Sequence, residues 1–223
     1  MTDDSLQYSA TGGTSWTKVE NPCTSGTRNP FSFVSLRTGW ILCGWDGAAG
    51  AMSKRLFRRD DGGRNWRMLG EALLGRDPDH KEDKEWPEGL PLADYSGGIT
   101  FVDEQHGWFF GVRYGSLYTT ADGGITWNSL GGNEVRGGGL EVLTATTAFR
   151  FGVGATNVVR VTTDGGKSWR QIYPIQRPQE LFYLDARTYI GVLESSLYRT
   201  NDGGRTWAEL ARFPAGEEPV TVF

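Results

Sequence analysis

The sequence has few of the residues from which metal and disulfide sites are built. It contains two cysteines, Cys23 and Cys43, and two histidines, His80 and His106, and these four do not form a ligand-spaced cluster. Two cysteines do not make a disulfide framework, so we interpret both as ordinary reduced residues, and a bond between Cys23 and Cys43 is the alternative. We therefore expect neither a metal site nor a cofactor.

An excess of positive charge and long apolar runs are also missing. The formal net charge of −4 offers no basic footprint, which argues against a nucleic-acid partner. No apolar run reaches about 18 residues, so we expect no membrane span, and the start MTDDSLQYSA has no apolar signal core. These features favour a cytoplasmic monomer. If a leader segment has been removed, we expect an exported protein instead.

What the sequence does have is one short phrase, repeated five times. Glycine and aspartate in this phrase predict a turn, because glycine accepts positive φ and the carboxylate accepts bonds from nearby backbone N–H groups. Each phrase therefore predicts the tip of a β-hairpin, and self-similarity at a roughly constant period is typical of repeat proteins. The five copies are SATGGTSW at 9–16, RDDGGRNW at 59–66, TADGGITW at 120–127, TTDGGKSW at 162–169 and TNDGGRTW at 200–207.

Each repeat also contains two strands ahead of the phrase. The stretch FVSLRTGW at 33–40 matches FVDEQHGW at 101–108, and each reads as a strand, a turn and the start of a second strand. With the hairpin that the phrase closes, this makes four short strands in about 40 residues, the size of a propeller blade.

We predict an all-β fold, a single β-propeller domain over 1–223 with about five four-stranded blades and an inserted loop at 70–98. The first residues supply only the last two strands of a blade, whereas PVTVF at 219–223 reads as the first strand of another. A ring closed by the N- and C-terminal segments uses both pieces and removes exposed strand edges.

The phrase resembles the Asp-box, or bacterial neuraminidase repeat, and the strand pair ahead of it resembles the photosystem II stability and assembly factor family. This resemblance covers nearly the whole chain and implies a propeller, but Asp-box proteins differ in function. In the resembled families the box is a structural turn between the third and fourth strands of a blade, away from the ligand face. The resemblance therefore implies structural roles for Asp61, Trp66, Asp122, Trp127, Asp164, Trp169, Asp202 and Trp207, and blade packing for Trp16 as well.

Strand parity places the loops. In a blade of four antiparallel strands, the turns after the first and third strands share one end, and the loops after the second and fourth share the other. Two long loops, Trp45–Ser53 and Gly70–Gly98, fall opposite the boxes, and long loops and surface aromatic residues often carry binding. A solvated loop without a partner remains the alternative. The candidate partner-binding residues are Trp45, Trp86, Leu90, Leu92, Tyr95, Arg113 and Tyr114.

These features predict a non-enzymatic propeller that binds another protein, as an assembly factor, inhibitor or receptor-like scaffold. The alternative is a sialidase-like glycoside hydrolase. That family requires an arginine trio, a tyrosine nucleophile and an acid Asp on a six-bladed frame, with an Arg-Ile-Pro signature before the first box. This chain has five repeats and no such signature before Ser9, so we favour the binding module and assign no catalytic residue.

Overall fold

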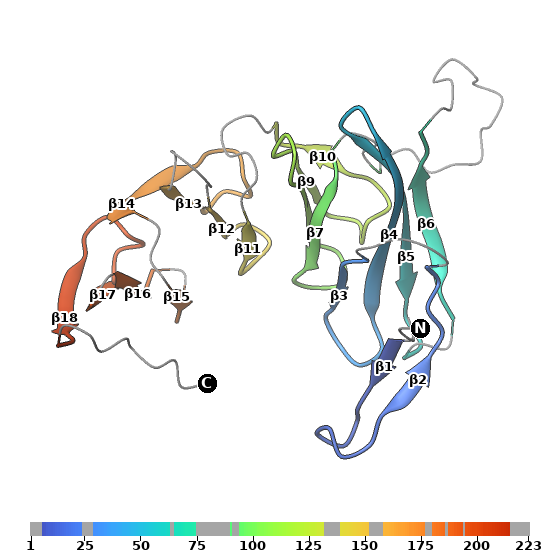
Figure 1. Ribbon diagram of the computed structural model, residues 1–223, viewed down its shortest axis with the longest axis horizontal. Coiled ribbons are helices and arrows are strands. Elements are labelled where there is room, and N and C mark those ends of the chain that lie inside the picture. Colours follow the sequence, from blue (N-terminus) through green and yellow to red (C-terminus); the bar gives the residue numbers. More distant parts are fainter. Residues whose placement is uncertain are drawn as a thin grey trace. The chain divides into compact units, whose positions relative to one another are not determined.

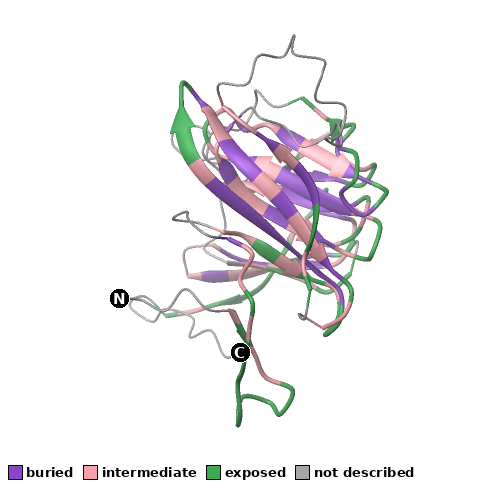
Figure 2. Ribbon diagram, turned by 90° about the vertical axis from the view of Figure 1, so that its right-hand side faces the viewer, coloured by how far each residue is buried: buried purple, intermediate pink, exposed green. Residues whose placement is uncertain are grey.

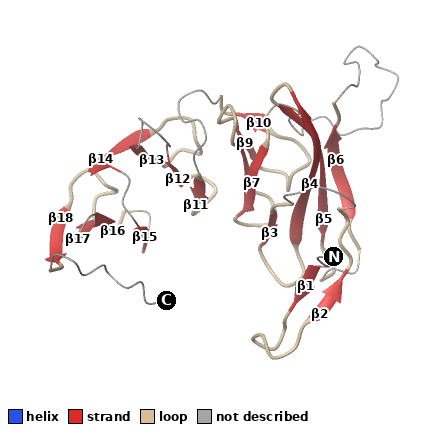
Figure 3. Ribbon diagram, in the orientation of Figure 1, coloured by secondary structure: helices blue, strands red, loops and turns tan. Residues whose placement is uncertain are grey.

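The computed structural model describes most of the chain, and all its regular elements are β-strands (Figure 3). They form four four-stranded sheets and one two-stranded sheet, all antiparallel, which confirms the predicted all-β propeller class. Within the described ranges, no helix is long and apolar enough to cross a bilayer. The described residues are 6–23, 29–62, 65–74, 90, 94–131, 139–151, 158–176, 180–185, 187–193 and 195–214.

The chain divides into two compact units, Met1–Glu134 and Val135–Phe223, and each is described by itself. That both belong to one propeller domain stays a prediction, and residues 219–223, the predicted closing strand, lie outside the described residues. The first unit holds the two-stranded sheet of β1 (Leu6–Tyr8) and β2 (Thr17–Val19) (Figure 1).

Two four-stranded sheets complete the first unit, and two more form the second. In every sheet the strands are neighbours in chain order, as in a propeller blade. The first unit contains β3 (Phe31–Phe33), β4 (Gly39–Ala48), β5 (Ala51–Arg59) and β6 (Arg67–Ala72), then β7 (Ser96–Phe101), β8 (Gly107–Gly111), β9 (Leu117–Thr120) and β10 (Asn128–Ser129). The second contains β11 (Leu140–Val142), β12 (Ala148–Phe151), β13 (Val158–Thr162) and β14 (Arg170–Gln176), then β15 (Glu180–Tyr183), β16 (Tyr189–Leu193), β17 (Ser196–Thr200) and β18 (Ala208–Arg212).

Neighbouring sheets pack through aromatic side chains. In the first unit, Trp40 of β4 stacks on Phe101 of β7, with ring centroids 3.7 Å apart and planes 3° from parallel. The indole N–H of Trp40 donates to the carbonyl of Gly123, at 2.8 Å. The second unit has a similar contact, since the ring centroid of Phe149 lies 4.2 Å from that of Tyr183 of the next sheet. The second strand of one blade thus covers the first strand of the following blade.

Each box turn is tied to the first turn of its own blade. The N–H of the first box glycine donates to a carbonyl of that turn, at 2.8 to 3.1 Å, in four sheets: Gly62 to Arg37, Gly123 to Gln105, Gly165 to Thr146 and Gly203 to Arg187. Both turns therefore lie at one end of the blade, as strand parity predicts. The second box glycine lies against the preceding sheet, because a Cβ at Gly124 would come within 3.0 Å of Leu56.

Two predicted loop boundaries are wrong. The stretch Trp45–Ser53 is mostly strand, because β4 continues to Ala48 and β5 begins at Ala51, leaving a tight turn at Ala49 and Gly50. The insertion predicted at Gly70–Gly98 is shorter, because β6 runs to Ala72 and β7 starts at Ser96. Antiparallel pairing of β4 with β5 and of β5 with β6 extends the strands into both stretches.

The two cysteines are joined, which corrects the prediction of reduced residues. Cys23 and Cys43 form a disulfide with a Cα–Cα distance of 5.3 Å, buried beside Ile41. The residues after β2 return to β4 through this disulfide, and the indole N–H of Trp66, directly before β6, donates to the carbonyl of Glu20, at 2.9 Å. The sequence shows only a separation of 20 residues and not this return.

The first box departs from the predicted packing role. Trp16 is 61% exposed, whereas Trp127 is 9% exposed. In this box Thr11 stands where the other copies have aspartate, and its hydroxyl accepts the N–H of Ser15 at 2.9 Å. The turn is therefore kept although its tryptophan contacts no core cluster among the described residues.

Candidate functional site

The end of the first unit opposite the boxes carries a surface built on one buried carboxylate. Asp94, just before β7, is fully buried and has a φ of 73°. Its carboxylate accepts the backbone N–H groups of Tyr95, Arg113, Tyr114 and Ser116, at 2.7 to 3.1 Å. Its own N–H donates to the carbonyl of Gly50, at 2.9 Å. The Asp94 carboxylate thus fixes the end of the insertion and the β8–β9 loop, and its backbone N–H ties them to the tip of the β4–β5 hairpin.

A buried lysine lies near this carboxylate. Lys54 of β5 is fully buried, and its ammonium lies 5.6 Å from the ring centroid of Phe109. Burial lowers the pKa of Lys54 to about 8, and the charge of Asp94 opposes that decrease. The electrostatic attraction between Lys54 and Asp94 therefore helps hold both charges inside the unit.

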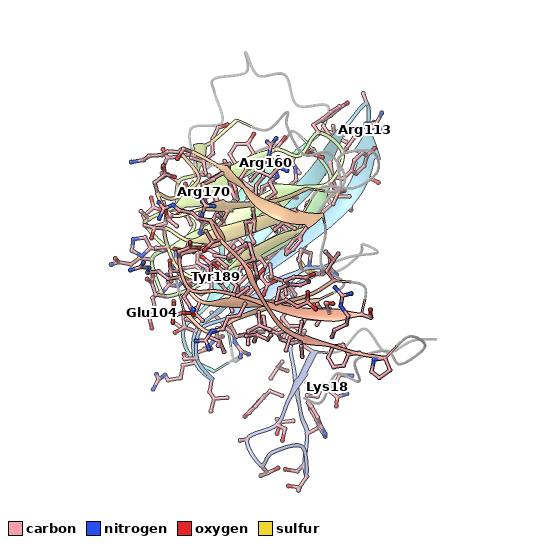
Figure 4. The ribbon with its side chains drawn as sticks, turned by 90° about the vertical axis from the view of Figure 1, so that its left-hand side faces the viewer. Lys18, Glu104, Arg113, Arg160, Arg170 and Tyr189 are labelled. Carbon is pink, nitrogen blue, oxygen red and sulfur yellow. A yellow bond between two sulfur atoms is a disulfide. The ribbon has the colours of Figure 1, made fainter. Side chains whose placement is uncertain are left out.

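The tip of the β4–β5 hairpin is exposed (Figure 2). Two tyrosines and an arginine lie around it. A Cβ at Gly47 would come within 2.3 Å of the Tyr95 ring, and one at Gly50 within 2.4 Å of ring atoms of Tyr114, so only glycine fits beneath these rings. The guanidinium of Arg113, which Figure 4 labels, lies 6.0 Å from the ring centroid of Tyr95 and 5.6 Å from that of Tyr114. We call Tyr95, Arg113 and Tyr114 the loop surface.

The other predicted partner-binding residues are placed differently. Trp45 is half-buried against the disulfide cluster, with the Arg55 guanidinium 4.9 Å from its ring centroid. Leu90 packs against the core cluster that contains Trp40. Trp86 and Leu92 lie outside the described residues. Three of the seven predicted residues are therefore brought together by the structure, while Trp45 and Leu90 both contact core clusters.

Sequence reasoning missed Asp94 and Lys54, the residues that position the loop surface. No motif marks either one. The only signal is an aspartate placed directly before a strand, at a position where its carboxylate can accept backbone N–H groups of a turn.

The box carboxylates are engaged inside their own turns. Asp164 accepts the hydroxyl and backbone N–H of Ser168 and the hydroxyl of Thr162, and these bonds lower its pKa to about 2. Bonds from Thr206 likewise lower the pKa of Asp202. Burial raises the pKa of Asp122, but the hydrogen bonds from Thr126, Thr120 and Ile125 together outweigh it and leave the pKa lowered. A general acid needs a raised pKa, so these carboxylates are poorly suited to protonate a leaving group.

The remaining box residues lie in or near their turns. Asp61 accepts from the side-chain amide of Asn65 at 2.7 Å. Trp127 is buried, whereas Trp66, Trp169 and Trp207 are half-buried. In the part of the chain that the structure describes, no three His, Cys, Asp or Glu side chains gather as metal ligands, and the expected lack of a metal stays a prediction.

Sequence comparison matches most of the repeats to a protein family. The family model described as "Photosynthesis system II assembly factor YCF48" matches residues 79–218. The chain belongs to this family. Its matched segment includes Tyr95, Arg113 and Tyr114 and the boxes of Asp122, Asp164 and Asp202, but not Trp45. No curated protein matches the chain by sequence.

Solved structures similar to this YCF48-family chain have diverse functions. YCF48 bound to D1 peptide is 16% identical, with 92% of this chain and 75% of that chain covered and a TM-score of 0.46. The GH74 xyloglucanase from Xanthomonas campestris is also 16% identical, over 92% of this chain and 28% of that chain, with a TM-score of 0.52. A chain of the nidogen/laminin complex is 14% identical, over 94% and 71%, with a TM-score of 0.54. The last two support the fold alone.

Proposed function

We propose that this YCF48-family chain is a non-enzymatic, protein-binding propeller that holds its partner on the loop surface. The observation that carries this proposal is the Asp94 carboxylate, which fixes the backbones of Tyr95, Arg113 and Tyr114. Tyrosine and arginine are the side chains in which interface energy concentrates. Because their backbones are already fixed, the loop surface loses less conformational entropy when a partner binds to it.

Family membership supports a photosystem II polypeptide as the partner. The family is described as an assembly factor of that complex, and an assembly factor acts by binding other polypeptides. We do not propose a glycoside hydrolase, because the lowered pKa values of Asp164 and Asp202 disfavour acid catalysis by the boxes.

We further propose that the chain is a monomer in an oxidising compartment. The disulfide between Cys23 and Cys43 supports the exported location over the cytoplasmic one, because thiols in the cytosol are kept reduced.

Titration with a fluorescent D1 peptide tests the proposed function. The double variant Arg113→Ala/Tyr114→Ala should bind at least about 30-fold more weakly, which corresponds to roughly 2 kcal/mol. Lys167→Ala, an exposed change in a box turn, is the matched control and should leave the affinity unchanged. The double variant Trp45→Ala/Trp86→Ala tests the other aromatic candidates.

Thermal melts of each variant separate binding from folding. Full affinity of Arg113→Ala/Tyr114→Ala in a protein that melts like the wild type would exclude the loop surface. Failure of the wild-type chain to bind the peptide would exclude D1 as the partner.

A further inference from the structure

A second surface of the first unit, built from different residues, is an apolar groove. A cavity of about 280 Å³ lies between β1 and β3. Its lining includes Phe31, Phe33 and Leu36, which are 58%, 39% and 69% exposed. We call it the open groove and define it by Leu6, Val19, Phe31, Phe33, Leu36 and Arg59.

The next blade shows what covers the equivalent residues. The match of FVSLRTGW with FVDEQHGW makes Phe33 the counterpart of Phe101, and Phe31 the counterpart of Ile99. Ile99 and Phe101 are only 5% and 4% exposed. They share one core cluster with side chains of the preceding sheet: Trp40 and Leu42 of β4, Leu56 of β5 and Leu69 of β6.

Of this cover, only half has a counterpart over the open groove within the part of the chain that the structure describes. Aligning the first box (9–16) with the second (59–66) makes Leu6 of β1 the counterpart of Leu56, and Val19 of β2 the counterpart of Leu69. Among the described residues, β1 pairs with β2 alone, so the edge where a second strand would lie carries no strand. The side chains without a counterpart are therefore those of the second strand, Trp40 and Leu42.

The groove also holds a buried donor. Arg59 is 5% exposed, and its Nε has no hydrogen-bond partner among the described residues. Its guanidinium lies 4.4 Å from the ring centroid of Phe33. A buried N–H without a partner is costly, so an occupant that brings an acceptor oxygen would be stabilised here.

We propose that the open groove binds an extended segment of another polypeptide, added as a strand beside β1. The segment carries an indole and, two residues later, an aliphatic side chain, because residues i and i+2 of a strand point to the same face. The indole stacks on Phe33, as Trp40 stacks on Phe101, and donates to the carbonyl of Gly62, the counterpart of Gly123. An oxygen of the segment accepts the Nε–H of Arg59. This site goes beyond the loop surface and does not depend on it.

The chain's own second strand supplies the probe. A fluorescein-labelled peptide with the sequence Thr38–Gly44 and the substitution Cys43→Ser presents the Trp-x-Leu pattern of β4. Anisotropy titration against the full chain should show saturable binding. The peptide with Trp40→Ala, and separately the protein with Phe33→Ala, should each weaken that binding by at least about tenfold. The protein variant Phe182→Ala is the control, since Phe182 is a 40% exposed phenylalanine of the second unit. This variant should bind the peptide like the wild type.

Several outcomes overturn the proposal. Absence of saturable binding does so, and so does equal binding by the Trp40→Ala peptide or by a folded Phe33→Ala protein. Displacement of the probe by a free peptide of residues 215–223 would assign the groove to the chain's own C-terminal segment. A dimer that Phe33→Ala dissociates, measured by sedimentation, would assign it to a second copy. A monomeric chain that binds the probe through Phe33, with no displacement by 215–223, supports the proposal.

Discussion

The sheets β3–β6 and β7–β10 present the same sequence positions to opposite environments. Phe101 is 4% exposed and lies under Trp40, whereas its counterpart Phe33 is 39% exposed and lines the open groove. Both follow the same strand-turn-strand pattern. The exposure of a repeat residue is therefore decided by the preceding blade, which is the nearest-neighbour behaviour expected of repeat proteins.

The exposed sheet is partly closed by other means. Ile41, the counterpart of Phe109, is 1% exposed because the connector after β2 and the Cys23–Cys43 disulfide cover it. In β3–β6, the disulfide and the connector thus cover part of the apolar face. In β7–β10, a complete preceding blade covers the equivalent face.

The largest expected difference comes from removing the equivalent aromatic rings. Phe101→Ala should lower the free energy of unfolding by about 3 to 5 kcal/mol, because it leaves a cavity under Trp40. Phe33→Ala should lower it by less than about 1 kcal/mol, because the ring is partly in solvent already. Urea unfolding at equilibrium measures the free energy of unfolding of both variants. Equal losses would mean that Phe33 and Phe101 are covered alike.

Reduction of the disulfide should have the next largest effect. Cross-linking residues 20 apart stabilises the folded chain by about 3 kcal/mol through loss of unfolded-state entropy. Melting with and without dithiothreitol should show this loss. The double variant Cys23→Ser/Cys43→Ser is the control, and its melting temperature should not respond to the reductant. An unchanged melt of the wild type would show that the connector alone closes this face.

The boxes offer a smaller test of the same comparison. Asp122→Ala removes the acceptor for the N–H and hydroxyl of Thr126 and should cost about 1 to 2 kcal/mol. Thr11→Ala in the degenerate first box should cost less than about 0.5 kcal/mol, because that turn is exposed. Urea unfolding of the two variants checks the order, and a reversed order would contradict the structural role given to the complete box.

The smallest expected effect is a pH dependence at Asp164. Its pKa is about 2 in the folded chain and 3.8 in the reference state, so its hydrogen bonds contribute stability that is fully present above about pH 4. This contribution should be lost as the pH falls from 3.8 to about 2. Melting temperatures between pH 5 and 2 should fall less steeply for Asp164→Asn than for the wild type. Lys167→Ala in the same turn should keep the wild-type slope.

The elements that could be predicted from the sequence are those whose signals are local. A Gly-Gly pair after aspartate requires positive φ, and the period-two alternation around it requires two strands, so the hairpins, the all-β class and the end of the blade that holds the boxes follow from a few adjacent residues. The first glycines of the boxes have the expected positive φ, as at Gly123 and Gly165. The site was predictable only as far as strand parity placed Tyr95, Arg113 and Tyr114 on one face.

Contacts between segments that are distant in the sequence could not be predicted and are seen only in the folded chain. The pairing of Cys23 with Cys43, the continuation of β4 to Ala48 and the buried bonds of Asp94 each depend on a segment that folds back from elsewhere in the chain. The same holds for Phe33, whose exposure depends on which strand lies beside β1. Local sequence sets backbone geometry over a few residues, whereas the burial of a side chain depends on the nonlocal segments that pack against it.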